Sequence, residues 1–209
     1  LRDTLGNLLG NELDMAVECL IAGLMYERGD LKEAYKFTLS ANAKIQYSFM
    51  SEVNFCALAT FVHILDALYQ PLQAQEVLNR LRDMIEKQRA YNLNYNLLAL
   101  TTRRKLENGD HNAAEYWLKE HGTGLYETLD LYRIYGHFAT FRSYIAIGNY
   151  DYSIILLNKL LRFSKIYKRP LDMIKSLILL SIAYWKKKKG FQVEALNILE
   201  EAIILAYNY

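Results

Sequence analysis

The amino-acid sequence predicts an all-α fold, an α-solenoid of about five helical hairpins with a period of about 40 residues. Only two prolines and ten glycines occur in 209 residues, which leaves little room for a many-turned β fold. Turn signals recur along the chain at Gly29, Gly109, Gly148 and Gly190. Because each helix of a hairpin buries only one apolar stripe, a hairpin needs neighbours of its own kind.

The first predicted unit covers residues 13–50. A helix from about Leu13 to Arg28 ends at Gly29, and glycine suits the left-handed position that closes a helix. Asp30 caps the return helix, which covers about Leu31 to Tyr47. We interpret residues 1–12, with three leucines at helical spacing, as the tail of a preceding helix.

The second and third units cover residues 51–91 and 92–125. In the second, a helix over 52–69 is followed by Gln70-Pro71 and a return helix over 72–89, and proline suits the first turn of that helix. In the third unit the outgoing helix covers 93–107, and the return helix, over 112–119, is short. Gly122-Thr123-Gly124 ends it and is the clearest irregularity in the chain.

The fourth and fifth units cover residues 126–169 and 170–209. The fourth turns at Gly148-Asn149, and the fifth pairs helices over 170–188 and 191–207 through Gly190. We interpret residues 1–209 as a single repeat domain excised from a longer protein. The reason is that the chain begins at Leu1 rather than Met and stops at Tyr209 inside a helical pattern.

A small residue follows each turn in step, and this register supports the repeat. The spacing between successive members is 40, 40, 39 and 42 residues, in the series Ala34, Ala74, Ala114, Ser153 and Ala195. A small side chain at that point lets two helices approach closely. An apolar residue follows at helical spacing in every unit, in the series Phe37, Leu78, Leu118, Leu157 and Leu199.

Composition and residue spacing exclude several function classes. A net charge of +2 gives no nucleic-acid-binding stripe, and no apolar run is long enough to span a bilayer. Two cysteines, Cys19 and Cys56, favour a reduced cytoplasmic protein. The four histidines form no i, i+4 zinc pair, so we expect structural or surface histidines and no metal. No constellation supports an enzyme or a catalytic residue.

Several aromatic and basic residues have a structural interpretation beside a functional one. We expect Tyr116 and Trp117 to pack in the core or under the loop, and Trp185 to pack between the fourth and fifth units. The basic run Lys186–Lys189 ends a helix, where cations favour the helix dipole. An acidic partner or a neighbouring domain is the alternative.

From Arg133 to Leu205 the sequence resembles the long-repeat tetratricopeptide region of MalT-like regulators of the LuxR family. The runs YIAIGNYDYSIILLNKLLRFSK and SLILLSIAYWKKKKGFQVEALNILEEAIILA carry the resemblance. Its positions are mostly packing residues: Gly148, Tyr150, Leu156, Leu157, Leu160, Leu161, Leu179, Leu180, Ala183, Ala195, Leu196, Leu199, Ala202 and Ala206. The resemblance implies a tetratricopeptide-like right-handed superhelix.

The resemblance also implies a function. In such regulators the repeat region is a sensor arm between a nucleotide-binding module and a helix-turn-helix, and it binds an inducer or an inhibitory partner. This sequence contains neither a phosphate loop nor a helix-turn-helix signature, so we expect no cofactor and no direct nucleic-acid contact. The expected partner is a small-molecule inducer or a regulatory protein or peptide, with no membrane and with a homo-oligomer possible.

Mapping the family's groove positions onto this sequence gives a candidate concave wall. Its members are polar or aromatic: Glu27, His63, Asp66, Asn96, Arg103, Tyr135, Phe138, Arg142, Tyr184 and Lys187. Aromatic faces stack on ligands, while arginine and asparagine supply fork-like hydrogen bonds. The alternative is that these are ordinary solvated or half-buried helix positions. A general scaffold that binds a partner's peptide or helix is the second functional hypothesis.

Overall fold

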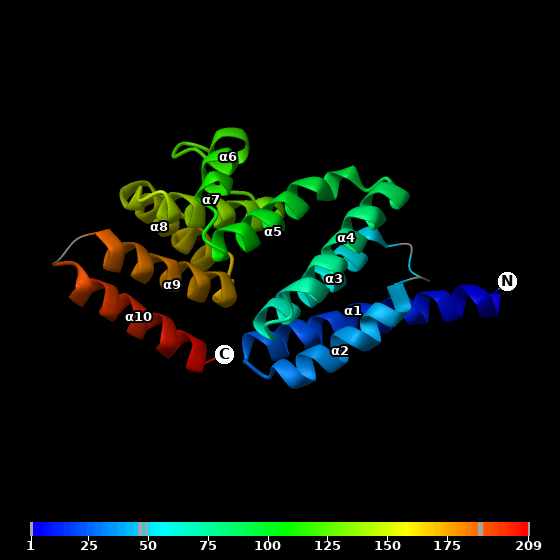
Figure 1. Ribbon diagram of the computed structural model, residues 1–209. Helices are drawn as coiled ribbons and strands as arrows, with labels where there is room; N and C mark the ends of the chain where they lie inside the picture. Colours follow the sequence, from blue (N-terminus) through cyan, green and yellow to red (C-terminus); the bar gives the residue numbers. More distant parts are fainter. Residues whose placement is uncertain (1, 46–47, 49, 188–189, 209) are drawn as a thin grey trace. The chain divides into compact units, whose positions relative to one another are not determined.

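The computed structural model describes residues 2–45, 48, 50–187 and 190–208. Within these ranges the chain is all-α and contains no strand (Figure 1). The helices are α1 (Arg2–Glu27), α2 (Leu31–Lys44), α3 (Ser51–Ala67), α4 (Pro71–Gln88), α5 (Asn94–Glu107), α6 (His111–His121), α7 (Ile134–Ala146), α8 (Tyr150–Ile166), α9 (Pro170–Lys187) and α10 (Gln192–Tyr207). Two short 3-10 helices, η2 (Tyr91–Leu93) and η3 (Leu131–Arg133), precede α5 and α7.

The chain divides into two compact units, Leu1–Leu97 and Leu98–Tyr209. In unit 1, α1 pairs with α2 and α3 pairs with α4, while α3 also contacts α1 and α2. A small core joins the first three helices through Ala22, Ala34 and Ile64, all of which are fully buried. The prediction of a single repeat domain over 1–209 stays a prediction.

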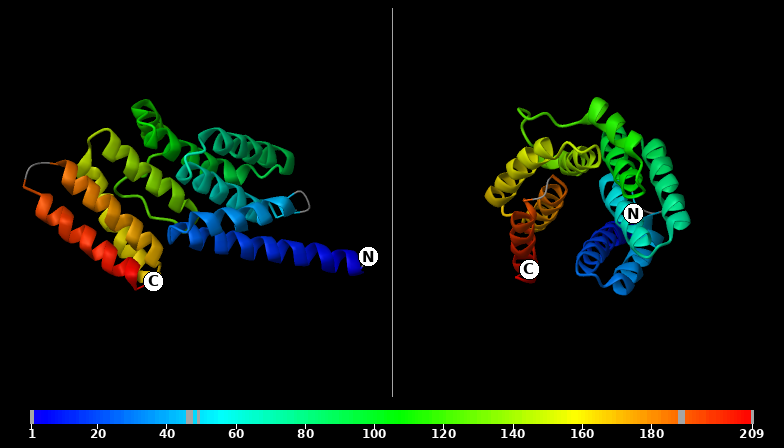
Figure 2. Two further views of the ribbon diagram at one scale, coloured as in Figure 1. Left: turned by 60° about the horizontal axis from the view of Figure 1, so that its bottom comes forward. Right: turned by 60° about the vertical axis from the view of Figure 1, so that its left-hand side comes forward.

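In unit 2, each helix from α6 to α10 packs against the next one, and α7 also contacts α9. The pair α9 and α10 packs side by side and runs antiparallel, as the left view of Figure 2 shows in orange and red. The core of unit 2 gathers leucines of α8 and α9 around the fully buried Phe141 of α7.

The small residues that follow the turns are buried, as expected for positions where two helices approach closely. Each of the five has an exposed fraction of at most 1%, in the series Ala34, Ala74, Ala114, Ser153 and Ala195. In the fourth hairpin, the Ser153 hydroxyl donates a hydrogen bond of 3.1 Å to the Phe141 carbonyl on the facing helix. A backbone contact of this kind requires close helix approach, which a larger side chain would prevent.

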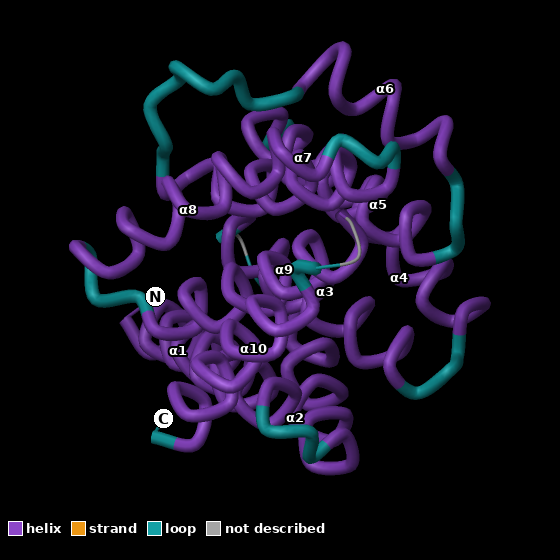
Figure 3. The backbone as a smooth tube through the Cα atoms, turned by 90° about the vertical axis from the view of Figure 1, so that its left-hand side faces the viewer, coloured by secondary structure: helices purple, strands orange, loops and turns teal. Residues whose placement is uncertain are grey.

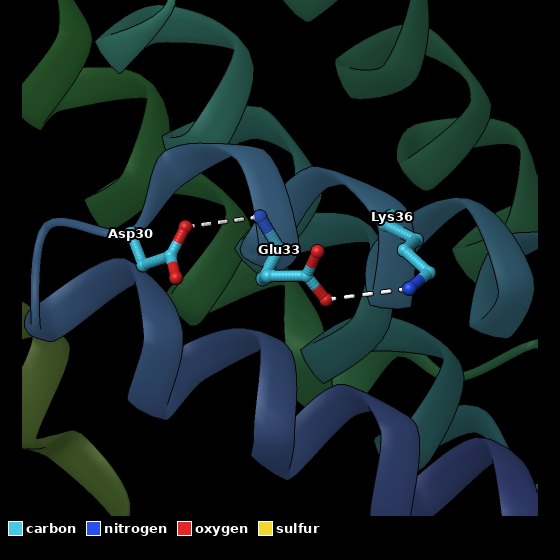
Figure 4. A network of polar contacts seen from close by, with 3 residues as sticks. All are labelled: Asp30, Glu33 and Lys36. Atoms are coloured by element: carbon cyan, nitrogen blue, oxygen red, sulfur yellow. Dashed lines mark hydrogen bonds and ion pairs between the residues drawn. The ribbon is translucent and has the colours of Figure 1, made fainter.

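The turns close the helices as expected. Gly29, Gly109, Gly148 and Gly190 all have positive φ, the left-handed conformation that glycine adopts without a steric cost. Asp30 then caps α2, because its carboxylate accepts the Glu33 backbone N–H at 3.2 Å (Figure 4). In the second hairpin the left-handed position is taken by Tyr69, with φ 58°, directly before Gln70 and the Pro71 that begins α4.

The first helix differs from its prediction. The chain forms one continuous helix from Arg2 to Glu27, so the expected separation of residues 1–12 from a helix starting at Leu13 is wrong. Gly6 and Gly10 weaken a helix but do not end it, because they keep their backbone N–H groups. Elsewhere the ends differ by a few residues, and Tyr47 and Lys188, two expected helix ends, lie outside the described residues.

Replacing Tyr69 by glycine is expected to raise the free energy of unfolding by about 1 kcal/mol. A non-glycine residue in the left-handed region costs about 1–3 kcal/mol, which exceeds the added unfolded-state entropy of glycine. Tyr69 is 92% exposed, so the substitution removes little packing. Urea denaturation followed by circular dichroism measures the change. The matched control, Gly29→Ala at φ 80°, is expected to lower stability by a similar amount, and a destabilised Tyr69→Gly variant contradicts the argument.

Candidate functional site

Three of the sequence-predicted residues lie on α7. Phe138 is 7% exposed and belongs to the core of unit 2. Arg142, one turn later, lies over its ring, with 5.7 Å between the guanidinium carbon and the ring centroid. Tyr135, which is 54% exposed, lies one turn before Phe138. Because a cation over an aromatic face is attracted by its quadrupole, this contact orients the guanidinium group.

Two more predicted residues lie on α9, which contacts α7. Tyr184 packs partly against the core of unit 2, and its ring lies 5.9 Å from that of Phe191. The Lys187 ammonium lies 5.1 Å from the Phe191 ring centroid and forms an ion pair with Asp151 of α8. The structure therefore places an arginine–aromatic pair on α7, and pairs the last lysine of α9 with Phe191 at the start of α10, while α7 and α9 are in contact.

The remaining predicted residues lie on α1, α3 and α5. The His63 ring stacks with Tyr26 at 6.1 Å in unit 1, near the end of α1 that carries Glu27. Asp66 lies in the last turn of α3. On α5, which crosses the boundary between the units, Arg103 forms an ion pair of 2.8 Å with Glu107, and Asn96 is half-buried. The prediction that all ten residues line one wall stays a prediction.

Between α6 and η3, a long loop over residues 122–130 is fixed to α7 by a buried polar network (teal in Figure 3). The Trp117 indole N–H donates to Thr140 Oγ1 at 3.0 Å, and the Thr123 backbone N–H donates to the same oxygen at 3.3 Å. The Thr140 hydroxyl in turn donates to the Gly136 carbonyl. Trp117 is fully buried, which confirms its predicted packing role. Thr140 supplies the hydrogen-bond acceptor that its buried indole N–H needs.

His137 holds the other end of this loop and is 1% exposed. Its Nε2 accepts the Asp130 backbone N–H at 3.1 Å, so the ring proton resides on Nδ1, 2.8 Å from Thr123 Oγ1. Burial, with a smaller contribution from the Arg133 charge, lowers the pKa of His137 to about 4. It is the satisfied structural histidine that the sequence favoured over a metal ligand.

A lysine from α8 completes the attachment of the loop. The Lys159 ammonium donates to the carbonyls of Leu125 and Glu127. Held at these points, the loop presents Tyr126, which is 99% exposed, and the following 3-10 turn presents Tyr132, which is 89% exposed. Sequence reasoning identified the irregular glycine loop but missed its partners on α7 and α8, because those residues have ordinary helical spacing.

Two aromatic predictions are wrong. Trp185 is 55% exposed and does not fill the space between the last two hairpins, because Ala183 and Leu180 take the buried positions of α9. Tyr116 is 61% exposed and its ring lies against that of His121, since the buried side of α6 is occupied by its alanines and Trp117.

Unit 1 contains an open depression of about 610 Å³ at the turn ends of its two hairpins. Its lining combines apolar and polar side chains of the α1–α2 and α3–α4 turns: Gly29, Asp30, Leu31, Lys32, Tyr35, Leu68 and Gln70. The Gln70 Oε1 atom is buried without a hydrogen-bond partner among the described residues. The depression has the volume of a small-molecule site.

Both cysteines are free thiols, Cys19 buried and Cys56 exposed. Burial raises the pKa of Cys19 to about 11, which keeps this thiol protonated near neutral pH and therefore unreactive. Within the described ranges, no cluster of three or more histidine, cysteine or carboxylate side chains has metal-binding geometry. No described helix is both long and apolar enough to cross a bilayer.

Comparison with protein-family models and with curated proteins returned no match to this chain.

The His137 geometry makes stability depend on pH. The folded-state pKa of about 4 lies below the ordinary 6.5, so the unfolded chain binds the extra proton more readily. The His137 contribution is complete above pH 6.5 and is lost as the pH falls from 6.5 to 4, by up to about 3 kcal/mol. In His137→Gln, an amide that cannot titrate replaces the imidazole, and stability is expected to change less over this range.

Urea denaturation at several pH values measures this difference. His111→Gln, at an exposed position on α6, is the control and is expected to keep the pH profile of the unmodified chain. Equal pH profiles for His137→Gln and the unmodified chain would contradict the proposed tautomer and its acceptor role.

Proposed function

We propose that this chain is a ligand-sensing or protein-interaction domain that binds an effector or partner through the outgoing helices of its hairpins. The proposal treats the hairpins as an α-solenoid of tetratricopeptide type, in which the outgoing helix of each unit lines the concave side. The observation that carries it is that α7 and α9 are in contact and that a predicted cation on each lies over an aromatic ring: Arg142 over the predicted Phe138, and Lys187 over Phe191, which precedes α10.

The repeat interpretation has support in both units. A buried small residue recurs at one register in five hairpins, and every outgoing-to-return turn uses a left-handed residue. Outgoing helices also contact each other, α1 with α3 and α7 with α9. In a tetratricopeptide solenoid, this pattern of neighbour contacts stacks the hairpins into a superhelix.

The finer part of the proposal is a MalT-like regulator of the LuxR family, cytoplasmic, with this chain as its sensor arm. It depends on the resemblance of residues 133–205, whose packing positions Leu156, Leu157, Leu160 and Leu180 are buried in the core of unit 2. Effector binding would change the packing between hairpins and so pass a signal to neighbouring modules.

Arg142 and Lys187 suit an acidic or carboxylate-bearing ligand. Both cations are held in place by an aromatic ring, so little side-chain entropy is lost when they bind a partner. Arginine in addition offers a planar fork to a carboxylate. The effector classes to test first are therefore sugar acids, aromatic acids and acidic peptides.

The second candidate, a scaffold for a partner protein, is favoured by the exposed tyrosines of the fixed loop. Tyr126 and Tyr132 are almost fully exposed on a segment held by buried hydrogen bonds. Rigid tyrosines contribute large contact area at small entropy cost, and for this reason they are enriched in protein interfaces.

Isothermal titration calorimetry with the three ligand classes tests the proposed site. Arg142→Ala is expected to weaken binding of an identified ligand at least tenfold, because a charge-assisted hydrogen bond contributes about 1.5–3 kcal/mol. Arg162→Ala, an exposed arginine on the return helix α8, is the matched control and should leave the affinity unchanged.

The results separate the two candidates. An equal loss of ligand affinity in both arginine variants, or an unchanged affinity in Arg142→Ala, contradicts the outgoing-helix site. If no small ligand or peptide binds, but a protein partner is retained and is lost on Tyr132→Ala, the scaffold is correct and the sensor is not.

A further inference from the structure

Four apolar side chains of α9 form an exposed row along one side of the helix. Their exposed fractions range from 38% to 55%, in the series Leu171, Ile178, Ile182 and Trp185. Together with the half-buried Lys175, they are spaced by four, three, four and three residues, the heptad spacing that keeps a row on one side of a helix. The core residues Leu180 and Ala183 lie on the opposite side of α9. The exposed row is thus a second apolar face on a helix whose first face is already packed.

The segment that contains this row is strongly basic, although the chain as a whole is not. Residues 159–190 contain ten lysine or arginine residues and one acidic residue, Asp172, whereas the whole chain contains 25 and 23. The rest of the chain is therefore net acidic, and the overall charge of +2 conceals the local excess. Asp172 is 7% exposed and forms an ion pair with Arg169, so it adds no negative charge to the exposed row. The next acidic residues in the sequence are the glutamates of α10.

The charged residues on the exposed side of α9 are lysines. Lys175 lies within the row, and the exposed Lys186 lies beside its carboxyl-terminal end. Lys187, two residues after Trp185, lies on the opposite side of the helix, where it pairs with Asp151 of α8. The row therefore combines apolar side chains with positive charge, and it shares no residue with the effector contacts proposed above.

We propose that this row is a docking surface for an acidic amphipathic helix of a partner protein. The apolar side of such a helix covers the leucine, isoleucine and tryptophan side chains, and its carboxylates lie against Lys175 and Lys186. From Leu171 to Trp185 the row is about 21 Å long at 1.5 Å per residue, which matches about four turns of a partner helix. Trp185 supplies an anchor of the residue type that is most enriched among the strongest contacts of protein interfaces.

Charge and exposure favour this occupant over three others. The same row of a second copy carries the same lysines, so packing the row on itself opposes like charges. A nucleic acid offers phosphates to the lysines, but its polar backbone would cover the isoleucines and Trp185. A bilayer requires apolar side chains that protrude into it, whereas each apolar member of the row is about half covered by its neighbours. An acidic amphipathic helix satisfies both the apolar row and its charge.

Fluorescence titration of the whole chain tests the proposal, because Trp185 is exposed whereas the other tryptophan, Trp117, is fully buried. The probe is a synthetic tryptophan-free peptide of about 18 residues, with leucine at the a and d positions, glutamate at e and g, and alanine elsewhere. We expect saturable binding that moves the Trp185 emission to shorter wavelength and weakens as salt is added. A matched peptide with lysine in place of glutamate is expected not to bind.

Variants of the row identify the surface by calorimetry with the same two peptides. Trp185→Ala is expected to weaken binding of the glutamate peptide at least tenfold. Tyr91→Ala is the matched control, because Tyr91 has the same exposed fraction of 55% and lies outside α9, and it should leave the affinity unchanged.

Charge reversal gives a second, independent measurement. The double variant Lys175→Glu/Lys186→Glu is expected to lose the glutamate peptide and to bind the lysine peptide instead, which a variant that is merely unfolded cannot do. Lys119→Glu, at an exposed lysine of α6, is the control and should keep the preference of the unmodified chain.

Several results overturn the docking surface. Absence of binding, equal affinity for the two peptides, or unchanged affinity in Trp185→Ala would show that the row does not select an acidic helix. A shift of the Trp185 emission by vesicles of anionic lipid or by duplex DNA, with no effect of either peptide, would assign the row to that partner instead. A sedimentation mass above 24.4 kDa that Trp185→Ala restores to the monomer value would place a second copy on the row.

Failure here is distinguishable from failure of the proposed function. Arg142 lies on α7 and outside the row, so Arg142→Ala should weaken the proposed effector and leave binding of the glutamate peptide unchanged. Trp185→Ala should have the reverse effect.

Discussion

Close contact within the helix pairs α1–α2, α3–α4, α7–α8 and α9–α10, at a fully buried small residue, is the constraint on which the rest of the structure depends. In each hairpin the residue at this register, from Ala34 to Ala195, has almost no exposed surface. The contact brings backbones near enough for Ser153 to bond a carbonyl on the facing helix. Because the helices approach this closely, the larger apolar residues one turn away can interlock into a core, as Leu156, Leu157 and Leu160 do in unit 2.

The third hairpin shows how a departure from the regular pattern is stabilised. Its return helix, α6, is short, and nine residues without helical structure follow before η3. Backbone groups in such a segment must still be hydrogen-bonded where they are buried. Thr140 and His137 of α7 meet this need, each by accepting a backbone N–H from the loop. The network therefore provides polar contacts where a longer α6 would have made helix–helix contacts. Its cost is that burial disfavours the charged form of His137, so the pKa of this imidazole is lowered.

Sequence reasoning predicted the helices and turns well, because local signals determine them. Glycine at the left-handed position, Asp30 as a cap and Pro71 at a helix start act within a few residues of the chain. The network around His137 could not be predicted, since its members are distant in sequence and gather only when α6 and α7 pack. Trp185 was misplaced for a related reason: periodicity gives the buried side of a helix only within a residue or so, and Ala183 holds the core position.

The candidate contacts follow the same division between local and tertiary information. A helical spacing of four put Phe138 and Arg142 on one face of α7, and this was visible in the sequence. That Lys187 would sit on Phe191 and pair with Asp151 was not visible, because the contact needs α8, α9 and the turn after α9 together. Both cations are thus oriented by neighbours before any partner arrives. A preoriented cation loses less conformational entropy on binding than a free one, and this is the physical reason for which the proposed site includes these two positions.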